Sequence, residues 1–184
     1  QLAMMEDAEQ TGIFVEKMAD FFRYNVKKGQ EDATLGEELE AVDNYIYILN
    51  VRFAGDIHFS KDVDESLENV RVPSMILQPV VENAVNHGIR DIEWEGKIHL
   101  TVTGDADYIR ISVKDNGKGM TPEQIEGVLT GNKKYKKEEG DSTGIGMNNV
   151  ISRLELYYEE TGLVEINSEG EGKGTEVVIY IPVN

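Results

Sequence analysis

The chain has 184 residues, 40% hydrophobic and 29% charged, an ordinary balance for one soluble globular domain or a domain with a helical appendage. Its formal net charge of −17 argues against a general nucleic-acid binder, which needs clustered Lys and Arg, and against adsorption to an anionic membrane surface. Cysteine is absent, so disulfides and thiolate chemistry are excluded.

Neither a membrane span nor a signal peptide is indicated, because no apolar run is long enough and the N-terminal pattern is wrong. The first residue is Gln rather than Met, and a helical pattern has already begun there. We therefore expect the chain to be part of a longer protein.

Two helices are predicted at the start of the chain. A wide apolar face rich in Met and Phe predicts the first, from about Leu2 to Lys28. This face would dock on the helix's own domain or, as we favour, pair with a second helix or a second chain. After a break, Thr34 and Glu37 match a capping box. The second helix then shows an apolar stripe up to Gly55, made of Leu35, Leu39, Val42, Ile46, Leu49 and Phe53.

The rest of the chain predicts strands and helices in one domain. Strands are expected at Ile57–Val63, Lys97–Thr103, Tyr108–Lys114, Leu163–Ser168 and Thr175–Pro182. Helices are expected at Pro73–His87, near Pro122–Leu129 within the loop Thr121–Thr143, and at Ile145–Glu160. Pro79 should kink the first of these or mark a restart, and Gly88 is placed as its C′ residue. Helices followed by a sheet with helices laid on it predict an α+β fold.

The first block with candidate chemistry is Glu82–Gly88, near a helix end. Asn83, Asn86 and His87 have the spacing i, i+3, i+4, which places them on one helix face. An Asn carbonyl oxygen suits Mg²⁺ that already carries phosphate oxygens and water, and the other two side chains could donate to phosphate. Alternatively, this is a polar helix end in which His87 interacts with the negative end of the helix.

The second block is KDNGKGM, at residues 114–120, which closes a strand. Asp115 could accept a hydrogen bond from an exocyclic amine such as that of adenine. Gly117 and Gly119 permit positive φ and remove Cβ atoms that would block a flat ring. The alternative is a tight strand-to-loop turn.

The third block is Ser142–Asn148, whose glycines precede a helix and could present free amides to phosphate. It is neither a Walker A motif nor G-x-G-x-x-G, and an ordinary loop-to-helix junction is the alternative. Just before it, NKKYKKEEG carries four lysines in five residues. This run is either solvated surface or a basic loop that closes over a triphosphate.

Taken in order, these blocks resemble a known family. ENAVNHG, DNGKG and TGIGMNN resemble the N, G1 and G2 boxes of the Bergerat ATP-binding fold over about residues 56–184. That fold is shared by gyrase, heat-shock chaperones, histidine kinases and mismatch-repair ATPases. FFRYNVKKG, TLGEELEAVDNYIYILNVRF and PSMILQPVVENAVNHGI closely resemble sensor histidine kinases of the LytS/YesM type.

The resemblance implies a Bergerat α/β sandwich, a mixed sheet with helices on one face, preceded by N-terminal helices. Residues 1–54 would be a remnant of the dimerisation and phosphotransfer region with a connecting helix, and residues 55–184 the catalytic domain. The implied function is transfer of the ATP γ-phosphoryl group to a histidine outside this chain, and from there to a response regulator. The parent protein would be a membrane-anchored homodimer that pairs through its N-terminal helices, with this part soluble and cytoplasmic.

The resemblance also implies the site. Asn83 would ligate Mg²⁺ beside Asn86 and His87, and Asp115 would hold the adenine amine. The other implied ATP contacts are Gly117, Gly119 and Met120 at the base, the lid lysines Lys133 and Lys134, the G2 residues Thr143, Gly144, Ile145, Gly146 and Met147, and Thr175 near the adenine.

Two departures from the family pattern matter. The phospho-acceptor motif is missing, since none of His58, His87 or His99 lies in an N-P-H-F type sequence. Pro79 stands where ATPases of the superfamily often have a catalytic Glu, and Glu82 is the nearest carboxylate. Phosphotransfer needs no activated water, so this fits a kinase better than an ATPase.

Three alternatives stay open. The chain could be a serine kinase of the anti-sigma-factor kind, although the long N-terminal helices argue against this. It could be an ATPase, although the missing Glu argues against that. It could also be a degenerate module that dimerises through residues 1–28 and binds no nucleotide. Intact Asp115, Gly117 and Gly119 argue against the last reading.

Overall fold

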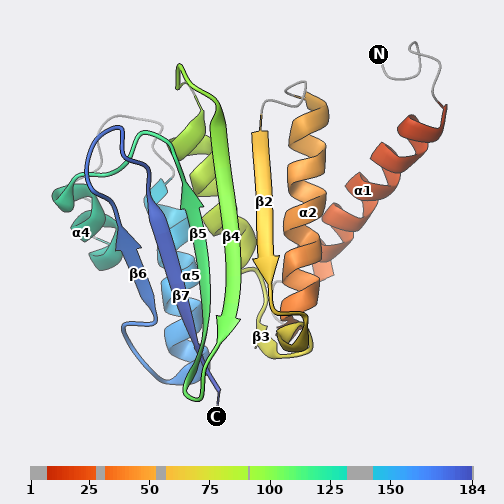
Figure 1. Cartoon of the computed structure of the whole chain (residues 1–184). Helices are drawn as coiled ribbons and strands as arrows, with labels where there is room; N and C mark the ends of the chain where they lie inside the picture. Colours follow the sequence, from red (N-terminus) through yellow and green to blue (C-terminus); the bar gives the residue numbers. More distant parts are fainter. Residues whose placement is uncertain (1–7, 28–31, 53–56, 91, 132–142, 184) are drawn as a thin grey trace.

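The computed structural model describes residues 8–27, 32–52, 57–90, 92–131 and 143–183. A five-stranded sheet with the order β2-β4-β5-β7-β6 forms its centre, and helices cover one face (Figure 1). The strands are β2 (Ile57–Val63), β4 (Gly96–Gly104), β5 (Tyr108–Asp115), β6 (Val164–Asn167) and β7 (Glu176–Pro182). β2 runs parallel to β4, and the three remaining strand pairs of this sheet are antiparallel. The predicted mixed sheet and α+β class are therefore confirmed.

The core lies between the sheet and the helices behind it. Alternate residues of β4 and β5 are buried there, such as Ile98, Leu100, Ile109 and Ile111. The hairpin predicted across residues 104–107 joins these two strands, with Gly104 paired to Ile109. Alternation was a reliable guide because only one face of this sheet is packed.

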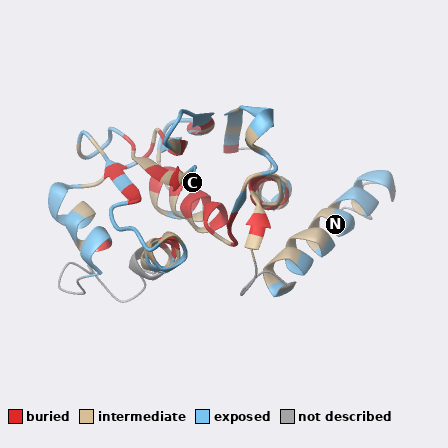
Figure 2. Cartoon of the chain, turned by 90° about the horizontal axis from the view of Figure 1, so that it is seen from below, coloured by how far each residue is buried: buried red, intermediate tan, exposed pale blue. Residues whose placement is uncertain are grey.

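The N-terminal helices are α1 (Ala8–Lys27) and α2 (Leu35–Arg52). The predicted capping box is confirmed: Thr34 N donates to Glu37 Oε2 over 2.8 Å, and Glu37 N donates to Thr34 Oγ1 over 3.1 Å. The α2 stripe is buried in the same core as the sheet, whereas none of residues 9–26 of α1 is buried (Figure 2). Phe53 and Gly55 lie outside the described residues, as do residues 28–31 of the predicted break.

The helix predicted to start at Pro73 is wrong in its boundaries. Pro73 ends the short strand β3 (Arg71–Pro73), which pairs with β1 (Asp32–Thr34) in a separate two-stranded sheet. The helix α3 begins only at Leu77 and ends at Asn83. Pro79 therefore lies in the first turn, where its missing N–H costs no helical hydrogen bond, so it causes neither a kink nor a restart.

A π-helical segment, η3 (Ala84–Ile89), continues α3. Arg90 N donates to Val85 O over 2.9 Å, an i→i+5 bond that widens the turn. The prediction of Gly88 as a C′ cap is wrong, because Gly88 is a buried residue inside this segment. Asn83 ends α3, whereas Asn86 and His87 lie in the π-helical segment, so the α-helical spacing used for the prediction does not run through all three.

The C-terminal half follows the prediction more closely. The helix α4 (Pro122–Thr130) carries a capping box between Thr121 and Gln124 and ends at Gly131, with φ 66°. The helix α5 (Thr143–Tyr158) lies behind the sheet, alongside β5 and β7 (Figure 1). A short 3-10 turn, η2 (Glu65–Leu67), precedes β3. No helix in the described ranges combines the length and apolar character that a membrane crossing requires.

Candidate nucleotide-binding site

The site is built around Asp115, the last residue of β5. Its carboxyl is buried at 5% exposure, and its Oδ1 accepts from Gly117 N over 2.8 Å and from Thr175 N over 3.3 Å. Burial raises the pKa of this carboxyl, while the two amide hydrogen bonds oppose that rise. Since both of these bonds use Oδ1, Oδ2 is the oxygen placed to accept from a further donor.

Three glycines close tightly around this carboxyl. A Cβ on Gly88 would lie 2.7 Å from Asp115 Cγ, and a Cβ on Gly174 would lie 2.1 Å from Asp115 O. A Cβ on Gly117 would lie 2.0 Å from Gly88 O. Lys118 N donates to Gly88 O over 2.9 Å, and Gly174 N donates to Gly117 O over 3.1 Å. The end of β5, the π-helical segment and the start of β7 thus meet backbone to backbone.

The expected reason for the two G1 glycines is therefore only partly correct. Gly119 does have a positive φ, 70°, but Gly117 is not among the glycines with positive φ. Both positions need glycine because a neighbouring backbone occupies the space, Gly88 for one and Gly170 O for the other, at 2.0 Å from the added Cβ. These close contacts hold Asp115 in place.

Ser168, the residue after β6, hydrogen-bonds to the same loops and was not predicted as a site residue from the sequence. Its Oγ accepts from Met120 N over 3.0 Å and donates to Gly174 O over 2.7 Å. Met120 is half-buried against the core beside it. A single serine in a polar loop gives no sequence signal of such a role.

Asn116 fastens the other side of the loop. Its Oδ1 accepts from Lys97 N over 2.7 Å, and its Nδ2 donates to Glu95 O over 2.9 Å. Trp94, the only tryptophan of the chain, donates from Nε1 to Asn116 O over 2.8 Å and is 48% exposed. A tryptophan thus reports directly on the segment that carries Asp115.

The N-box residues end α3 and begin the π-helical segment. Asn83 Nδ2 is buried and has no hydrogen-bond partner among the described residues. Glu82 Oε1 accepts from Gln78 Nε2 over 2.7 Å. Asn86 is exposed and His87 is half-buried. An uncommitted buried amide at Asn83 fits a group that must bind something outside the protein.

The structure covers the G2 and lid residues only in part. Lys133 and Lys134 lie outside the described residues. Thr143, Gly144 and Ile145 form the first turn of α5, so the glycines lie inside the helix rather than before it. A Cβ on Gly146 would lie 3.9 Å from Pro79 Cβ, which places this turn beside α3, and Met147 is buried in the core.

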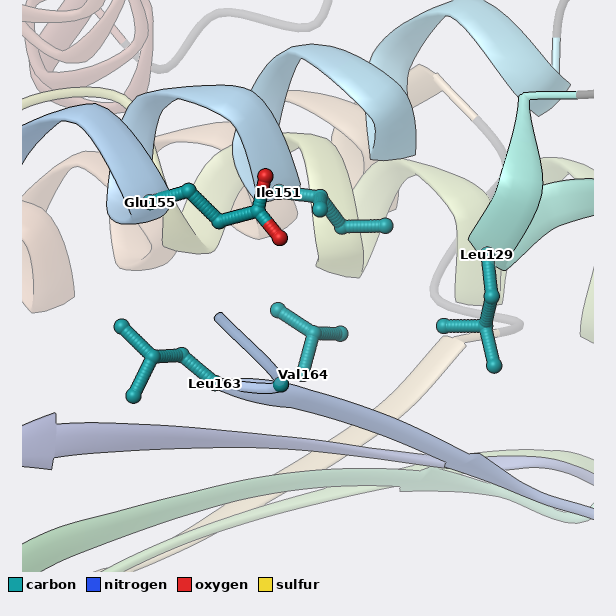
Figure 3. Close-up of a pocket in the computed structure, with 6 residues that line it drawn as sticks. Leu129, Ile151, Glu155, Leu163 and Val164 are labelled. Carbon is teal, nitrogen blue, oxygen red and sulfur yellow. The ribbon is translucent and has the colours of Figure 1, made fainter. Parts of the chain in front are cut away.

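A separate pocket of about 210 Å³ lies between α5, the end of α4 and the start of β6 (Figure 3). It is lined by Leu129, Ile151, Glu155, Gly162, Leu163 and Val164. None of these residues belongs to the three sequence blocks. The residues around Asp115 and this pocket are therefore in different places.

Family models match both parts of the chain. Residues 71–184 match the model of histidine kinase-, DNA gyrase B-, and HSP90-like ATPases. Residues 1–57 match the histidine kinase model. The blocks around Asn83 and Asp115 lie within the first of these matches.

Curated relatives are sensor histidine kinases. The chain is 35% identical to the sensor histidine kinase YpdA of Escherichia coli, over 90% of this chain and 27% of that protein. It is 29% identical to the sensor histidine kinase YesM of Bacillus subtilis, over 98% of this chain and 29% of that protein. The chain thus spans less than a third of the length of these relatives.

Solved histidine kinase domains share the fold. The nucleotide-free catalytic domain of histidine kinase ThkA superposes with a TM-score of 0.58 at 21% identity, covering 83% of this chain and 94% of that one. The histidine kinase domain of a blue-light activated kinase from Erythrobacter litoralis gives 0.54 at 20% identity, covering 96% and 76%.

Proposed function

The chain belongs to the family of histidine kinase-, DNA gyrase B-, and HSP90-like ATPases, and we propose that it is the ATP-binding catalytic domain of a sensor histidine kinase. One observation carries the proposal: a buried carboxylate, Asp115, held by two backbone amides inside a cradle of glycines. Such a carboxylate is suited to accept from the exocyclic amine of adenine, because its position is fixed before the base arrives.

Around the base and phosphates, we propose the following roles. Gly117, Gly119 and Met120 form the loop beside the adenine, and Thr175 holds Asp115 through its amide. The first turn of α5, with Gly144 and Gly146, approaches the phosphates together with Thr143, Ile145 and Met147. Lys133 and Lys134 close over the phosphates from the lid.

We propose that Asn83 provides the protein ligand for Mg²⁺, with Asn86 and His87 next to the phosphates. The donor type fits this group, because the carboxamide oxygen of Asn83 is a hard ligand and the rest of the ligand shell would come from phosphate and water. The buried Nδ2 of Asn83, which has no partner among the described residues, is a donor and is suited to a phosphate oxygen. Mg²⁺ would supply neutralisation of the phosphate charge. Within the described ranges no cluster of three or more His, Cys, Asp or Glu side chains could hold a metal ion.

The proposed reaction is an in-line phosphoryl transfer. The bond between the γ-phosphorus and the bridging oxygen breaks, ADP leaves with that electron pair, and a histidine nitrogen forms the new bond to phosphorus. No water has to be activated, which suits a site where Pro79 replaces a catalytic Glu and Glu82 is bonded to Gln78. The site then acts by positioning and by charge stabilisation.

The acceptor is proposed to be a histidine outside this chain. His58 pairs with Glu95 over 3.0 Å and His99 bonds Ser60 over 2.8 Å, both on strands of the sheet. His87 lies in the π-helical segment beside the proposed phosphate site. None of the three stands on a long exposed helix that could approach a γ-phosphate, and the phosphoryl group would pass onward to a response regulator.

We further propose that residues 1–54 contribute to a homodimer and to the link with the acceptor region, with 55–184 as the catalytic domain. Half-buried Phe14, Met18 and Phe21 follow one side of α1, and Phe21 stacks on Tyr45 of α2 with ring centroids 5.9 Å apart. Val15 and Phe22 remain more than half exposed, at 59% and 55%. A second apolar side on the same helix favours pairing with another helix. The parent would be membrane-anchored, with this domain in the cytoplasm.

The test is calorimetric titration of Mg-ATP into the chain, its Asp115→Asn variant and a matched control, Asp105→Asn. Asp105 Oδ1 also accepts from two backbone amides, Asp107 N and Tyr108 N, both over 2.9 Å, but at the opposite end of β5. We expect binding by the parent and the control, and at least tenfold weaker binding by Asp115→Asn, about 1.4 kcal/mol. Equal affinity in all three would place the nucleotide elsewhere, and no binding by the parent would refute the proposed function.

A further inference from the structure

A buried acidic side chain on α2 takes no part in the proposed ATP site. Glu38 is 1% exposed, and its two oxygens face the start of α3. Oε1 accepts from Met75 N over 2.5 Å, and Oε2 accepts from Ile76 N over 2.9 Å and from Leu77 N over 2.8 Å. A buried carboxylate is costly unless hydrogen bonds replace its water, and here three consecutive backbone amides do so.

These amides are the ones that a helix start leaves without partners. The N-cap position of α3, Ile76, makes no side-chain capping bond of its own. Glu38 therefore caps α3 from another helix, a long-range substitute for the usual local Ser, Thr, Asp or Asn. Removing it would leave two buried N–H groups, those of Ile76 and Leu77, and the partly buried N–H of Met75 without this partner.

The turn that Glu38 holds is strained. Met75 has a φ of 59°, in the left-handed region that residues with a side chain rarely adopt. Arg153 of α5 fastens the same turn by donating from Nη1 to Ser74 O. Helices α2 and α5 thus both fix the conformation from which α3 starts.

The start of α3 is connected to the proposed ATP site through one short rigid stretch. α3 runs only from Leu77 to Asn83, the proposed Mg²⁺ ligand, and continues into the segment whose Gly88 touches Asp115. Pro79 lies beside Gly146 at the proposed phosphate side. A shift at Met75–Leu77 would therefore move residues on two sides of the nucleotide.

α1 reaches this same carboxylate. Tyr24 donates its hydroxyl to Glu38 Oε1, the oxygen that also binds Met75 N. Burial, and then the charge of Glu38, raise the pKa of the Tyr24 hydroxyl, so it remains a proton donor at neutral pH. Between residues 9 and 26 of α1 every side chain is half-buried or exposed, and Val15, Phe22 and Val26 are exposed apolar side chains (Figure 2).

We propose that Glu38 is a positioning residue that fixes the start of α3, and that Tyr24 makes this positioning depend on whether α1 is docked on α2. Docking of α1 and binding of Mg-ATP are then thermodynamically linked, and each favours the other by the same factor. With α1 docked, Glu38 has its tyrosine donor and the Met75 turn is held. With α1 undocked, Glu38 loses that donor, gains water and holds the turn less firmly. The link to ATP rests on the proposed function, whereas the positioning of α3 does not.

The experiment uses Tyr24→Phe, which keeps the ring and removes the hydroxyl. Its matched control is Tyr180→Phe, because Tyr180 also donates its hydroxyl to a carboxylate, Glu165, over 3.0 Å, on the sheet. Affinity for Mg-ATP is measured by calorimetry. Hydrogen exchange is measured at the amides of Met75, Ile76 and Leu77 and along α1, with and without Mg-ATP.

We expect Tyr24→Phe to bind Mg-ATP about fivefold more weakly or worse, and Tyr180→Phe to bind it like the parent. Hydrogen exchange at Met75–Leu77 should be faster than in the parent in Tyr24→Phe but not in Tyr180→Phe. Mg-ATP should slow exchange along α1 in the parent, and this protection should be lost in Tyr24→Phe. A merely structural role would not produce that reciprocal loss.

Several outcomes would overturn the inference. One is unchanged affinity together with unchanged exchange at Met75–Leu77 in Tyr24→Phe. Another is faster exchange across the whole domain, which would make the hydroxyl a general stabilising group. If the parent itself does not bind Mg-ATP, the proposed function and the link to ATP both fail. Exchange at Met75–Leu77 then still decides whether Tyr24 acts on α3.

Discussion

The close backbone contact at Gly117 gives the sharpest prediction. In Gly117→Ala the added Cβ would lie 2.0 Å from Gly88 O, 2.1 Å from Gly88 C and 2.6 Å from Gly88 Cα. All three are backbone atoms, and a Cβ essentially never approaches other atoms closer than 3.0 Å, so one chain segment must move by about 1 Å. Because φ at Gly117 is not positive, the substitution tests this contact and not a backbone preference.

That movement would break identifiable interactions. Lys118 N donates to Gly88 O, and Gly117 N donates to Asp115 Oδ1. Overpacking costs about 2 kcal/mol and each of the two lost hydrogen bonds about 1 kcal/mol, so the free energy of unfolding should fall by about 4 kcal/mol. Affinity for Mg-ATP should fall at least tenfold, because Asp115 loses one of its two amide donors.

The assays are urea denaturation for the free energy of unfolding and calorimetry for Mg-ATP. Gly12→Ala in α1 is the control, since a Cβ there meets nothing within 4 Å. It should leave affinity unchanged and raise stability by up to about 1 kcal/mol, because Ala favours helix over Gly. Gly117→Ala with the stability and affinity of the parent would refute the packing that we describe around Asp115.

The remaining four predictions concern Asp115, Thr34 and Trp94. Burial raises the pKa of Asp115 above its ordinary value of 3.8, so Mg-ATP affinity should weaken as the pH falls through that raised pKa, by at most about tenfold per pH unit, and Asp115→Asn should lack this dependence. The stability of the free protein should depend on pH in the opposite direction. The raised pKa of Asp115 contributes favourably to folding below pH 3.8, and this contribution is lost as the pH rises through the raised pKa. Urea denaturation at several pH values would detect this loss. Thr34→Ala should lower the free energy of unfolding by about 1 kcal/mol by removing the capping box, without changing Mg-ATP affinity; a change in affinity would contradict this separation. Trp94 fluorescence should change on adding Mg-ATP, because Trp94 bonds Asn116 O next to Asp115, and a flat titration with binding seen by calorimetry would contradict this coupling.

The sequence predicted those features whose cause lies within a few residues. The capping box needs only Thr34 and Glu37, three positions apart, and it forms as expected. Strands β4 and β5 alternate because one face of the sheet is packed, so period 2 located them and their hairpin. The order of Asn83, Asp115 and Gly119 also pointed to the region where the structure brings η3, the end of β5 and the loop before β7 together.

Features set by distant partners could not be predicted. Pro73 looked like a helix start because proline is common there, but pairing of Arg71–Pro73 with Asp32–Thr34 made it a strand end. Gly88 looked like a helix cap, but glycine is needed there because a Cβ would clash with the carboxyl group of Asp115, which is distant in the sequence. The i→i+5 bonding at Val85 and Arg90 has no local sequence signature either.

The start of α3 shows why such distant effects concentrate near a functional site. A helix that begins at Ile76 with no cap of its own, after a Met in the left-handed region, would be a poor helix start in isolation. The fold tolerates it because Glu38 supplies the cap from 37 to 39 residues away. A local Ser or Asp cap would stabilise α3 regardless of what other helices do. A cap borrowed from α2, and shared with Tyr24 of α1, instead makes the position of Asn83 depend on how the N-terminal helices pack.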